Sequence, residues 1–385
     1  INAEYMGRED IFGKMAIPRA ANPYQKVPHS KPPFTLADIK KAIPPRCFRR
    51  SLLRSFFHVF ADLAVILLLH HVAAAYFHLI PAPLRYAAWP AFWAAQGCFL
   101  VGWWVLAHEC GHHAFSDYAW LDDAVGFLIH SSLLVPYFSW KISHRLHHAN
   151  ANSLERDETF VPKLKPDLPW YQRRLSNPPG RALALLGSAV AGWPLYLLCN
   201  ITGRSYDRLA CHFDPFSPMY AERDRVQICA SDAGVIAAAY GLHRVAAANG
   251  VGWLLRFYAA PLAVVHALVV LIIYLHHTHP SLPRYGGGEW EWLRGALATV
   301  DRDYGALNHV FHHIADTHVL HHLLPSVPHY HAVEATAAIK GVLGEYYRCD
   351  GTPILKSLWR EVRECVYIEP APQSTGVFWF TGKGL

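Results

Sequence analysis

The chain has 385 residues, of which 52% are hydrophobic and 17% are charged, and its net charge at pH 7 is +6. Soluble domains average about 25% charged residues, so this composition argues against a string of soluble domains. The positive charge is modest and spread along the chain, which gives no nucleic-acid footprint and fits contact with anionic lipid or an acidic partner. Because 13 Trp and 19 Tyr would suit the interfacial belts of a membrane protein, we expect one integral membrane domain with polar ends.

Residues 1–50 are polar and rich in proline, and we expect them to form a cytosolic N-terminal segment. Thr35 is typical of a helix N-cap and predicts a short helix that runs to Ala42. Four arginines precede the first apolar run: Arg46, Arg49, Arg50 and Arg54. The positive-inside rule therefore places this side of the membrane in the cytosol.

Two apolar runs, Phe56–Phe77 and Ala87–Ala107, are long enough to cross a bilayer core, which takes about 20 helical residues. A short connector with Pro81 and Pro83 joins them, so we expect a hairpin. The hairpin returns the chain to the cytosolic side where the first histidine cluster begins. Phe127–Trp140 is apolar but too short to cross, which favours an interfacial or re-entrant segment.

Three further apolar runs follow residue 180: Ala182–Leu198, Ala233–Leu242 and Phe257–Leu275. If all histidine clusters share one side of the membrane, the chain crosses an even number of times between the second and third clusters. We favour a second hairpin of residues 228–248 and 252–275, with Ala182–Leu198 in the interface. The rival pairing of 182–200 with 257–275 stays open.

The expected architecture is an all-α integral membrane protein with four transmembrane helices in two hairpins, interfacial helices and a cytosolic helical cap over the histidines. Residues 51–330 would form the membrane domain, and 331–385 a cytosolic C-terminal segment with an aromatic tail. We expect residues 330–347 to form an amphipathic helix.

Three histidine clusters carry the chemistry, and their sequences are His108-Glu109-Cys110-Gly111-His112-His113, His144-Arg145-Leu146-His147-His148 and His318-Val319-Leu320-His321-His322. Residues three and four apart share a helix face. Eight imidazoles are therefore candidate metal ligands: His108, His112, His144, His147, His148, His318, His321 and His322. One closed zinc site takes about four ligands, so the pattern predicts two metal ions. Spacing does not name the metal, since imidazole suits Zn, Cu, Fe and Ni.

Other polar residues are weaker candidates. His277 ends the last apolar run, where it could supply a further ligand. Four residues could orient the ligands from behind: His113, Glu155, Asp157 and Asp316. A solvated loop is an equal alternative for the carboxylates. His312 and His313 fall off the pattern and are expected at the surface or behind the ligands.

A nitrogen-rich two-metal site beside a bilayer suits oxidation of a membrane lipid, because cleaving an unactivated C–H bond needs the strong oxidant that a metal and oxygen supply. The sequence contains no nucleotide-binding fingerprint, so electrons would come from another protein. It also lacks a G-x-S-x-G elbow, which argues against a serine esterase. A histidine-rich metal transporter is the rival class. Transporters place ligands at mid-membrane in repeated halves, whereas these clusters follow the spans and no repeat is visible.

The clusters, H-E-C-G-H-H, H-R-x-H-H and H-V-x-H-H, resemble the histidine boxes of membrane-bound fatty acid desaturases, especially the plant microsomal oleate (Δ12, or omega-6) group. Flanking segments continue the resemblance over nearly the whole chain after about residue 25: Ala114–Tyr118, Trp120–Asp123, Leu133–Trp140, Ser153–Glu158, Asp301–Gly305 and Pro328–Tyr330. The resemblance implies a desaturase that introduces a second cis double bond into a monounsaturated acyl chain.

The resemblance further implies two iron ions held by the eight box histidines, O2 as co-substrate, and electrons from cytochrome b5 and its NADH-dependent reductase. His277 falls where related di-iron membrane enzymes use another histidine. The implied location is the endoplasmic reticulum membrane, multi-pass, with the boxes facing the cytosol and an acyl-lipid or acyl-CoA substrate. Phe378–Phe380 is similar to the family's retrieval signal. Assembly with further copies or with other desaturases stays open.

The sequence departs from the group near the ligands, at Leu146, Ala149–Asn152, Leu320 and Val327, whereas Ala107 has the ordinary desaturase form. We expect these departures to shape the acyl channel. A hydroxylase, epoxygenase, conjugase or acetylenase on the same scaffold therefore stays open, as does a desaturase of unusual chain length or regiochemistry.

Overall fold

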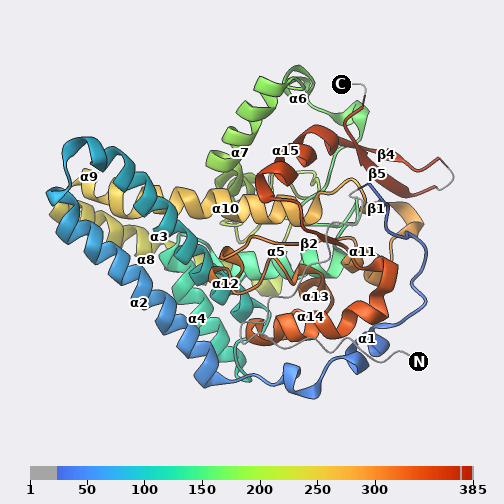
Figure 1. Ribbon diagram of the computed structural model, residues 1–385, viewed down its shortest axis with the longest axis horizontal. Helices are drawn as coiled ribbons and strands as arrows, with labels where there is room; N and C mark the ends of the chain where they lie inside the picture. Colours follow the sequence, from blue (N-terminus) through green and yellow to red (C-terminus); the bar gives the residue numbers. More distant parts are fainter. Residues whose placement is uncertain (1–23, 373–374, 384–385) are drawn as a thin grey trace, which may run out of the picture.

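The computed structural model describes residues 24–372 and 375–383, and most of them are helical (Figure 1). The α-helices are α1 (Leu36–Ala42), α2 (Leu52–Tyr76), α3 (Ala82–Gly111), α4 (Ala119–Ser132), α5 (Tyr137–Asn150), α6 (Trp170–Arg174), α7 (Pro178–Cys199), α8 (Arg225–Asn249), α9 (Val251–Leu254), α10 (Ala260–His277), α11 (Trp292–Leu297), α12 (Leu307–Val310), α13 (His318–Leu323), α14 (His329–Leu343) and α15 (Ile354–Glu364). The strands are β1 (Pro283–Tyr285), β2 (Asp301–Arg302), β3 (Cys349–Asp350), β4 (Tyr367–Pro370) and β5 (Val377–Thr381). The predicted helical architecture is confirmed, and the short strands are an addition to it.

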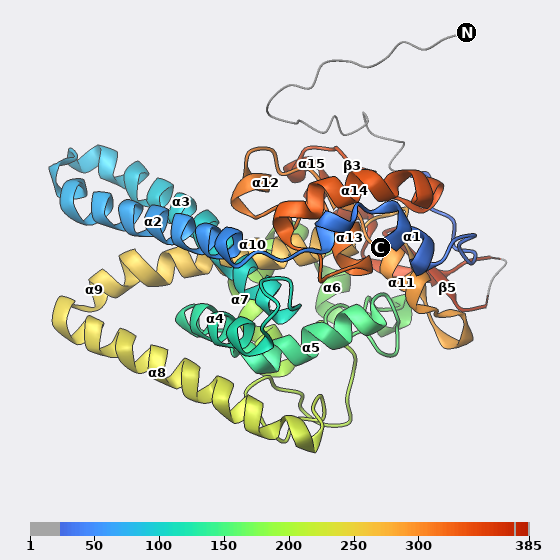
Figure 2. The same cartoon turned by 90° about the horizontal axis from the view of Figure 1, so that it is seen from below.

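The first apolar hairpin consists of α2 and α3, as predicted, and the two helices lie side by side in Figures 1 and 2. Ser51 caps α2, and Pro81 precedes α3. At 1.5 Å per residue the 30 residues of α3 span about 45 Å, whereas the apolar core of a bilayer is about 30 Å thick. α3 can therefore cross the bilayer and still carry its last turns, with His108, beyond the apolar core.

A second pair of helices is formed by α8 and by the continuous helical run from α9 to α10. The turn between them lies at Gly250, whose φ of +87° is readily adopted only by glycine. This pair extends toward the same end of the molecule as α2 and α3 (Figure 2). The arrangement agrees with the favoured hairpin of residues 228–248 and 252–275.

Length and hydropathy select a different fourth helix. Among the described residues, four helices are long and apolar enough to cross a membrane: Leu52–Leu79, Ala82–Gly111, Pro178–Cys199 and Val251–His277. α7 is thus a candidate span, which does not support the interfacial position predicted for Ala182–Leu198. α8 is not selected because polar residues such as Asp232 and Arg244 lower its hydropathy. With either helix, two candidate crossings separate the second and third histidine clusters.

The apolar segment Phe127–Trp140 is divided in the structure, although the sequence predicted one element. α4 ends at Ser132, Leu134 adopts a φ of +57°, and Pro136 precedes α5. The break allows α5 to start in a new direction, and this helix carries the second histidine cluster.

The polar ends of the chain pack around the third cluster. Thr35 is the N-cap of α1, as predicted, and it forms a capping box with Asp38; α1 packs on α14. One apolar core includes residues of α1, α11, α13 and α14: Ile39, Leu297, Val319, Leu320 and Ile339. Segments from both ends of the chain therefore pack against the third cluster. The division at residues 50 and 330 stays a prediction, and residues 1–23 lie outside the described ranges.

The aromatic tail forms β5, which pairs antiparallel with both β1 and β4 in a three-stranded sheet. Trp379 faces Pro283 on one side and Glu369 on the other. Trp379 and Phe380 are buried. The segment that is similar to a retrieval signal is thus part of a packed sheet.

Candidate metal centre

The first histidine cluster lies at the end of α3. His112 follows the last helical residue, and its backbone N–H still bonds to the carbonyl oxygen of His108 at 3.3 Å. The rings of His108 and His112 therefore share one side, with centroids 4.8 Å apart. His113 adopts a φ of +54°, so the chain leaves the helix direction there.

The second and third clusters lie on α5 and α13, and His277 is the last residue of α10. Side chains three or four residues apart share a face but differ in height by one helical turn. Each of these two helices therefore presents histidines at two levels, which allows one cluster to serve two neighbouring metal ions.

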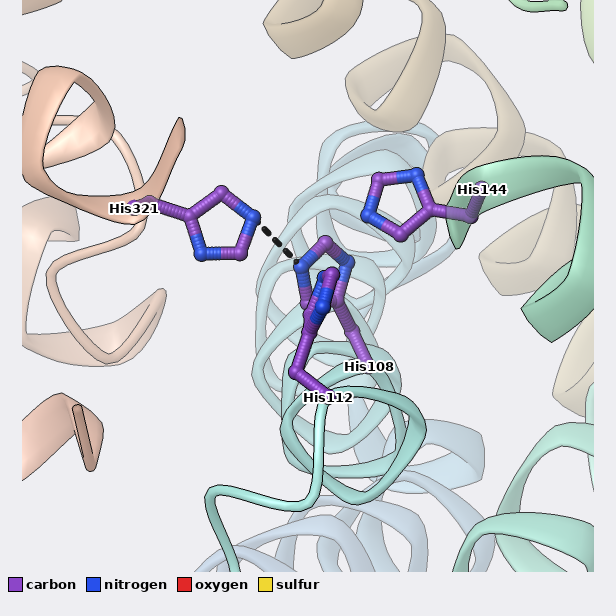
Figure 3. Close-up of side chains that lie close together, drawn as sticks. All are labelled: His108, His112, His144 and His321. Carbon is purple, nitrogen blue, oxygen red and sulfur yellow. Dashed lines mark hydrogen bonds between the residues drawn. The ribbon is translucent and has the colours of Figure 1, made fainter. Parts of the chain in front are cut away.

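The histidines gather in two groups. The His108 group consists of His108, His112, His144 and His321, and the His147 group consists of His147, His277 and His322. Within each group, one possible ligand atom per residue lies within 4.8 Å of the others. Figure 3 shows the four rings of the His108 group converging, with Nε2 of His108 2.9 Å from Nε2 of His321. The second and third clusters each supply a histidine to both groups.

Two more predicted ligands connect the groups. Nε2 of His148 lies 3.1 Å from Nε2 of His144, and the His148 ring stacks on the ring of His322 with centroids 4.3 Å apart. Nε2 of His318 lies 3.4 Å from Nε2 of His277. The structure thus brings together all nine histidines that the sequence singled out.

Burial keeps six imidazoles outside the candidate spans neutral. It lowers the pKa of His112 and of His318 to about 3. It also lowers the pKa of four other histidines well below the usual value: His144, His148, His321 and His322. Only the neutral ring offers a lone pair to a metal, so this environment favours ligation over protonation.

Many ring nitrogens of this site are buried and have no hydrogen-bond partner within the described residues. They are Nδ1 of His108, Nε2 of His112, Nδ1 of His148, Nδ1 of His277 and both ring nitrogens of His322. Each such atom costs about 1–3 kcal/mol when it stays unpaired, so the cluster is unfavourable as a hydrogen-bonded core alone. Metal coordination would satisfy ring nitrogens of this kind. The donor set, nine nitrogens against about four per closed site, fits two metal ions.

Asp157 orients one of the rings. Its Oδ1 lies 2.7 Å from Nδ1 of His147, and its carboxylate also accepts backbone N–H groups of Asn152 and Thr159, both at 2.9 Å. Burial alone would raise the pKa of Asp157, but these hydrogen bonds outweigh it and the net pKa is lowered. An ionised carboxylate holds the proton of His147 on Nδ1, which leaves Nε2 free for a metal.

The other three predicted supporting residues have different partners. Nδ1 of His113 lies 3.3 Å from Asp122. Asp316 lies 2.9 Å from Nδ1 of His313. Glu155 accepts the backbone N–H of Gly287 at 2.9 Å. No hydrogen bond among the described residues joins these three to a ligand histidine, so their orienting role stays a prediction.

The sequence analysis missed three residues that shape the site. The His276 ring lies 4.4 Å from that of His318, and only the helical phase of α10 distinguishes it from the neighbouring His277. Trp140 stacks on His144 with centroids 4.6 Å apart, and its spacing of four residues on α5 was a usable signal. Oδ1 of Asp301 accepts the backbone N–H of Val319 at 2.7 Å and caps α13. The two residues are 18 positions apart, so no local sequence pattern predicts this contact.

Apolar helices that end in two adjoining groups of histidines define a helical membrane protein with a candidate metal site. The chain belongs to the fatty acid desaturase family, since the sequence model described as "Fatty acid desaturase" matches residues 84–350. That range contains all nine histidines of the site. The protein is therefore an oxidoreductase of lipid metabolism.

The chain is similar to several curated plant proteins over nearly its full length. It is 58% identical to the Delta(12)-acyl-lipid-desaturase of Punica granatum, an alignment that covers 96% of this chain and 98% of the relative. It is 60% identical to the omega-6 fatty acid desaturase, endoplasmic reticulum isozyme 2, of Glycine max, over 94% and 95% of the two chains. It is also 58% identical to a bifunctional desaturase/conjugase of Vernicia fordii, over 93% and 94%.

Proposed function

We propose that the protein is an O2-dependent acyl-lipid desaturase that introduces a second cis double bond, of the Δ12 or omega-6 type, into a monounsaturated acyl chain. The observation that carries this proposal is the convergence of nine histidines at the ends of apolar helices, seven in two adjoining groups and two that connect them. Two relatives, 58% and 60% identical to this chain and named a Delta(12) and an omega-6 desaturase, support the position of the double bond.

The two groups would each hold one iron ion, with His108, His112, His144 and His321 around one, His147, His277 and His322 around the other, and His148 and His318 between them. Iron supplies the oxidising power for C–H cleavage when O2 and electrons are provided. The protein's own share is to hold the rings in place. Asp157 keeps His147 in one tautomer, and burial keeps the imidazoles unprotonated.

Substrate positioning falls to a pocket beside the His108 group. Its open space, including the mouth, measures about 260 Å³, and its lining mixes apolar side chains (Leu320, Leu324 and Val327) with polar ones (Glu109, His312, His321 and His329). An acyl chain on the apolar side would pass the candidate ligand His321. Misplacement of a reacting group by about 1 Å can cost a hundredfold in rate, so these side chains would select the methylenes that react.

Electrons would come from cytochrome b5 and its NADH-dependent reductase, because the chain contains no nucleotide-binding fingerprint of its own. The candidate spans and a relative named as an endoplasmic reticulum isozyme support an endoplasmic reticulum membrane location. The histidines would face the cytosol, because arginines precede the first span on that side. The acyl chain would be esterified to a membrane lipid, in keeping with the name of the Punica granatum relative.

A related outcome is favoured by one specific observation. Leu320 and Val327, which depart from the usual residues of the Δ12 group, both line the pocket, and a relative of 58% identity is named a desaturase/conjugase. A changed wall could move the chain and give a conjugated, hydroxylated, epoxidised or acetylenic product, or a desaturated product of unusual chain length or regiochemistry.

Expression in yeast, followed by mass spectrometry of the total acyl chains, tests the proposal. We expect a new diunsaturated chain with methylene-interrupted cis double bonds, and its absence in a matched His148→Ala strain. New hydroxy, epoxy or conjugated chains alone would refute the desaturase assignment and favour the related outcome.

A further inference from the structure

Three more histidines meet outside the nine described above. They are His58 in the second turn of α2, His312 between α12 and α13, and His329 at the start of α14. One possible ligand atom from each lies within 4.8 Å of the others. The His58 ring lies 4.5 Å from the His329 ring and 5.3 Å from the His312 ring, and the rings of His312 and His329 are 4.7 Å apart. We call these residues the His58 group.

A buried carboxylate accompanies the group. Oδ2 of Asp62, one turn after His58 on α2, lies 2.7 Å from Nε2 of His312. Gly102 of α3 permits this close approach, because a Cβ there would lie 3.1 Å from Oδ2 of Asp62 and would collide with the carbonyl oxygen of Val310. A carboxylate beside an imidazole either orients a ligand histidine or completes the ligand set, and both are usual around zinc.

His329 offers a nitrogen that the protein leaves unused. Its side chain is 93% buried, and Nε2 has no hydrogen-bond partner within the described residues. Leaving such an atom buried and unpaired is unfavourable, and a metal ion would satisfy it.

The backbone at His312 is also unusual. Its φ is +50°, a left-handed value that residues with a Cβ rarely adopt. The chain accepts this conformation where the His312 side chain is directed toward Asp62 and His329. Two independent features, the unpaired nitrogen and the strained backbone, therefore occur at the same three-histidine group.

We propose that the His58 group binds a third metal ion, Zn²⁺, held by His58, His312 and His329, with Asp62 orienting the His312 ring. Three imidazoles are a known zinc ligand set, and a carboxylate behind a ligand histidine is usual there. The ion ties the first membrane hairpin, through α2, to α14 and to the loop before α13. Its role is structural, and it does not depend on the oxidation chemistry proposed above.

Metal analysis of the purified full-length protein tests this inference. We expect three metal ions per chain, iron and zinc counted together, in the wild-type protein. His58→Phe should lower the count by one, whereas the matched change His71→Phe, on the same helix but outside the group, should leave it unchanged. A His58→Phe protein that keeps the wild-type count would overturn the proposal.

Two further measurements separate this inference from the function proposed above. His148→Ala reports on the nine-histidine site, so a loss there with no loss in His58→Phe would overturn the third site and leave the desaturase proposal in place. X-ray absorption at the zinc edge of the wild-type protein needs no folded variant. Zinc in a shell of imidazole nitrogens supports the site, and absence of zinc overturns it.

Discussion

Asp157→Asn tests whether the carboxylate behind His147 sets the metal affinity of the centre. The Asp157 carboxylate accepts three short hydrogen bonds, from the His147 ring and from the backbone N–H groups of Asn152 and Thr159. Hydrogen bonds to a charged group contribute about 1.5–3 kcal/mol each, against about 1 kcal/mol for neutral pairs. An asparagine keeps one acceptor oxygen, but its amide N–H₂ must face a backbone donor.

The expected net loss is about 1.4–2.8 kcal/mol, which equals a 10- to 100-fold weaker metal affinity, as is typical when such an orienting partner is removed. The assay is competition for iron with a chelator of known affinity, combined with the yield of new acyl chains in yeast. Glu155→Gln is the matched control, because Glu155 lies two residues away and bonds to Gly287. Unchanged affinity in Asp157→Asn, or an equal loss in Glu155→Gln, would refute the reasoning.

Three other predictions follow from the same contacts. Leu320→Ala together with Val327→Met should change the ratio of acyl products by about tenfold or more, since both side chains line the pocket beside the ligands. Product analysis in yeast measures the ratio. An unchanged ratio would show that the pocket does not position the substrate. Trp379→Ala should destabilise the fold by about 3–5 kcal/mol, because it empties a packed position of β5, and thermal unfolding in detergent should show a lower Tm. Burial raises the pKa of Asp301 to about 7, above its unfolded value, so the folded state binds this proton more tightly and stability falls as the pH rises from about 4 to 7. Asp301→Asn should flatten that part of the stability profile, and an unchanged slope would count against the raised pKa.

Local spacing was sufficient to predict much of this structure. The i, i+3, i+4 pattern placed the histidines of α5 and α13 on common faces, and the hydropathy of α2 and α3 predicted the first hairpin. Both signals act within one helix, where geometry follows directly from sequence separation. The helix after Thr35 was predicted for the same reason, since a capping box is a contact between near neighbours.

Other features depend on tertiary contacts and were missed. Glu155 and Asp157 are equivalent in the sequence as acidic residues after the second cluster, yet the turn at Asn152, with a φ of +64°, directs only Asp157 to a ligand. Two observations also disagree on whether α7 or α8 is the fourth span. Length and hydropathy favour α7, whereas the pairing of α8 with the run from α9 to α10 favours α8. No property of either segment alone resolves that difference.

The three histidine groups show which parts of a metal site residue spacing cannot predict. The His108 and His147 groups each draw on two or three clusters, so the sequence identified their members but could not assign each ligand to an ion. The His58 group takes one histidine from each of three separate segments, and none of them belongs to an i, i+3, i+4 cluster in the sequence. A metal site built in this way has no local signature. It becomes visible only when α2, α14 and the loop before α13 pack together, and for that reason the metal count of His58→Phe separates a third site from a chance gathering of rings.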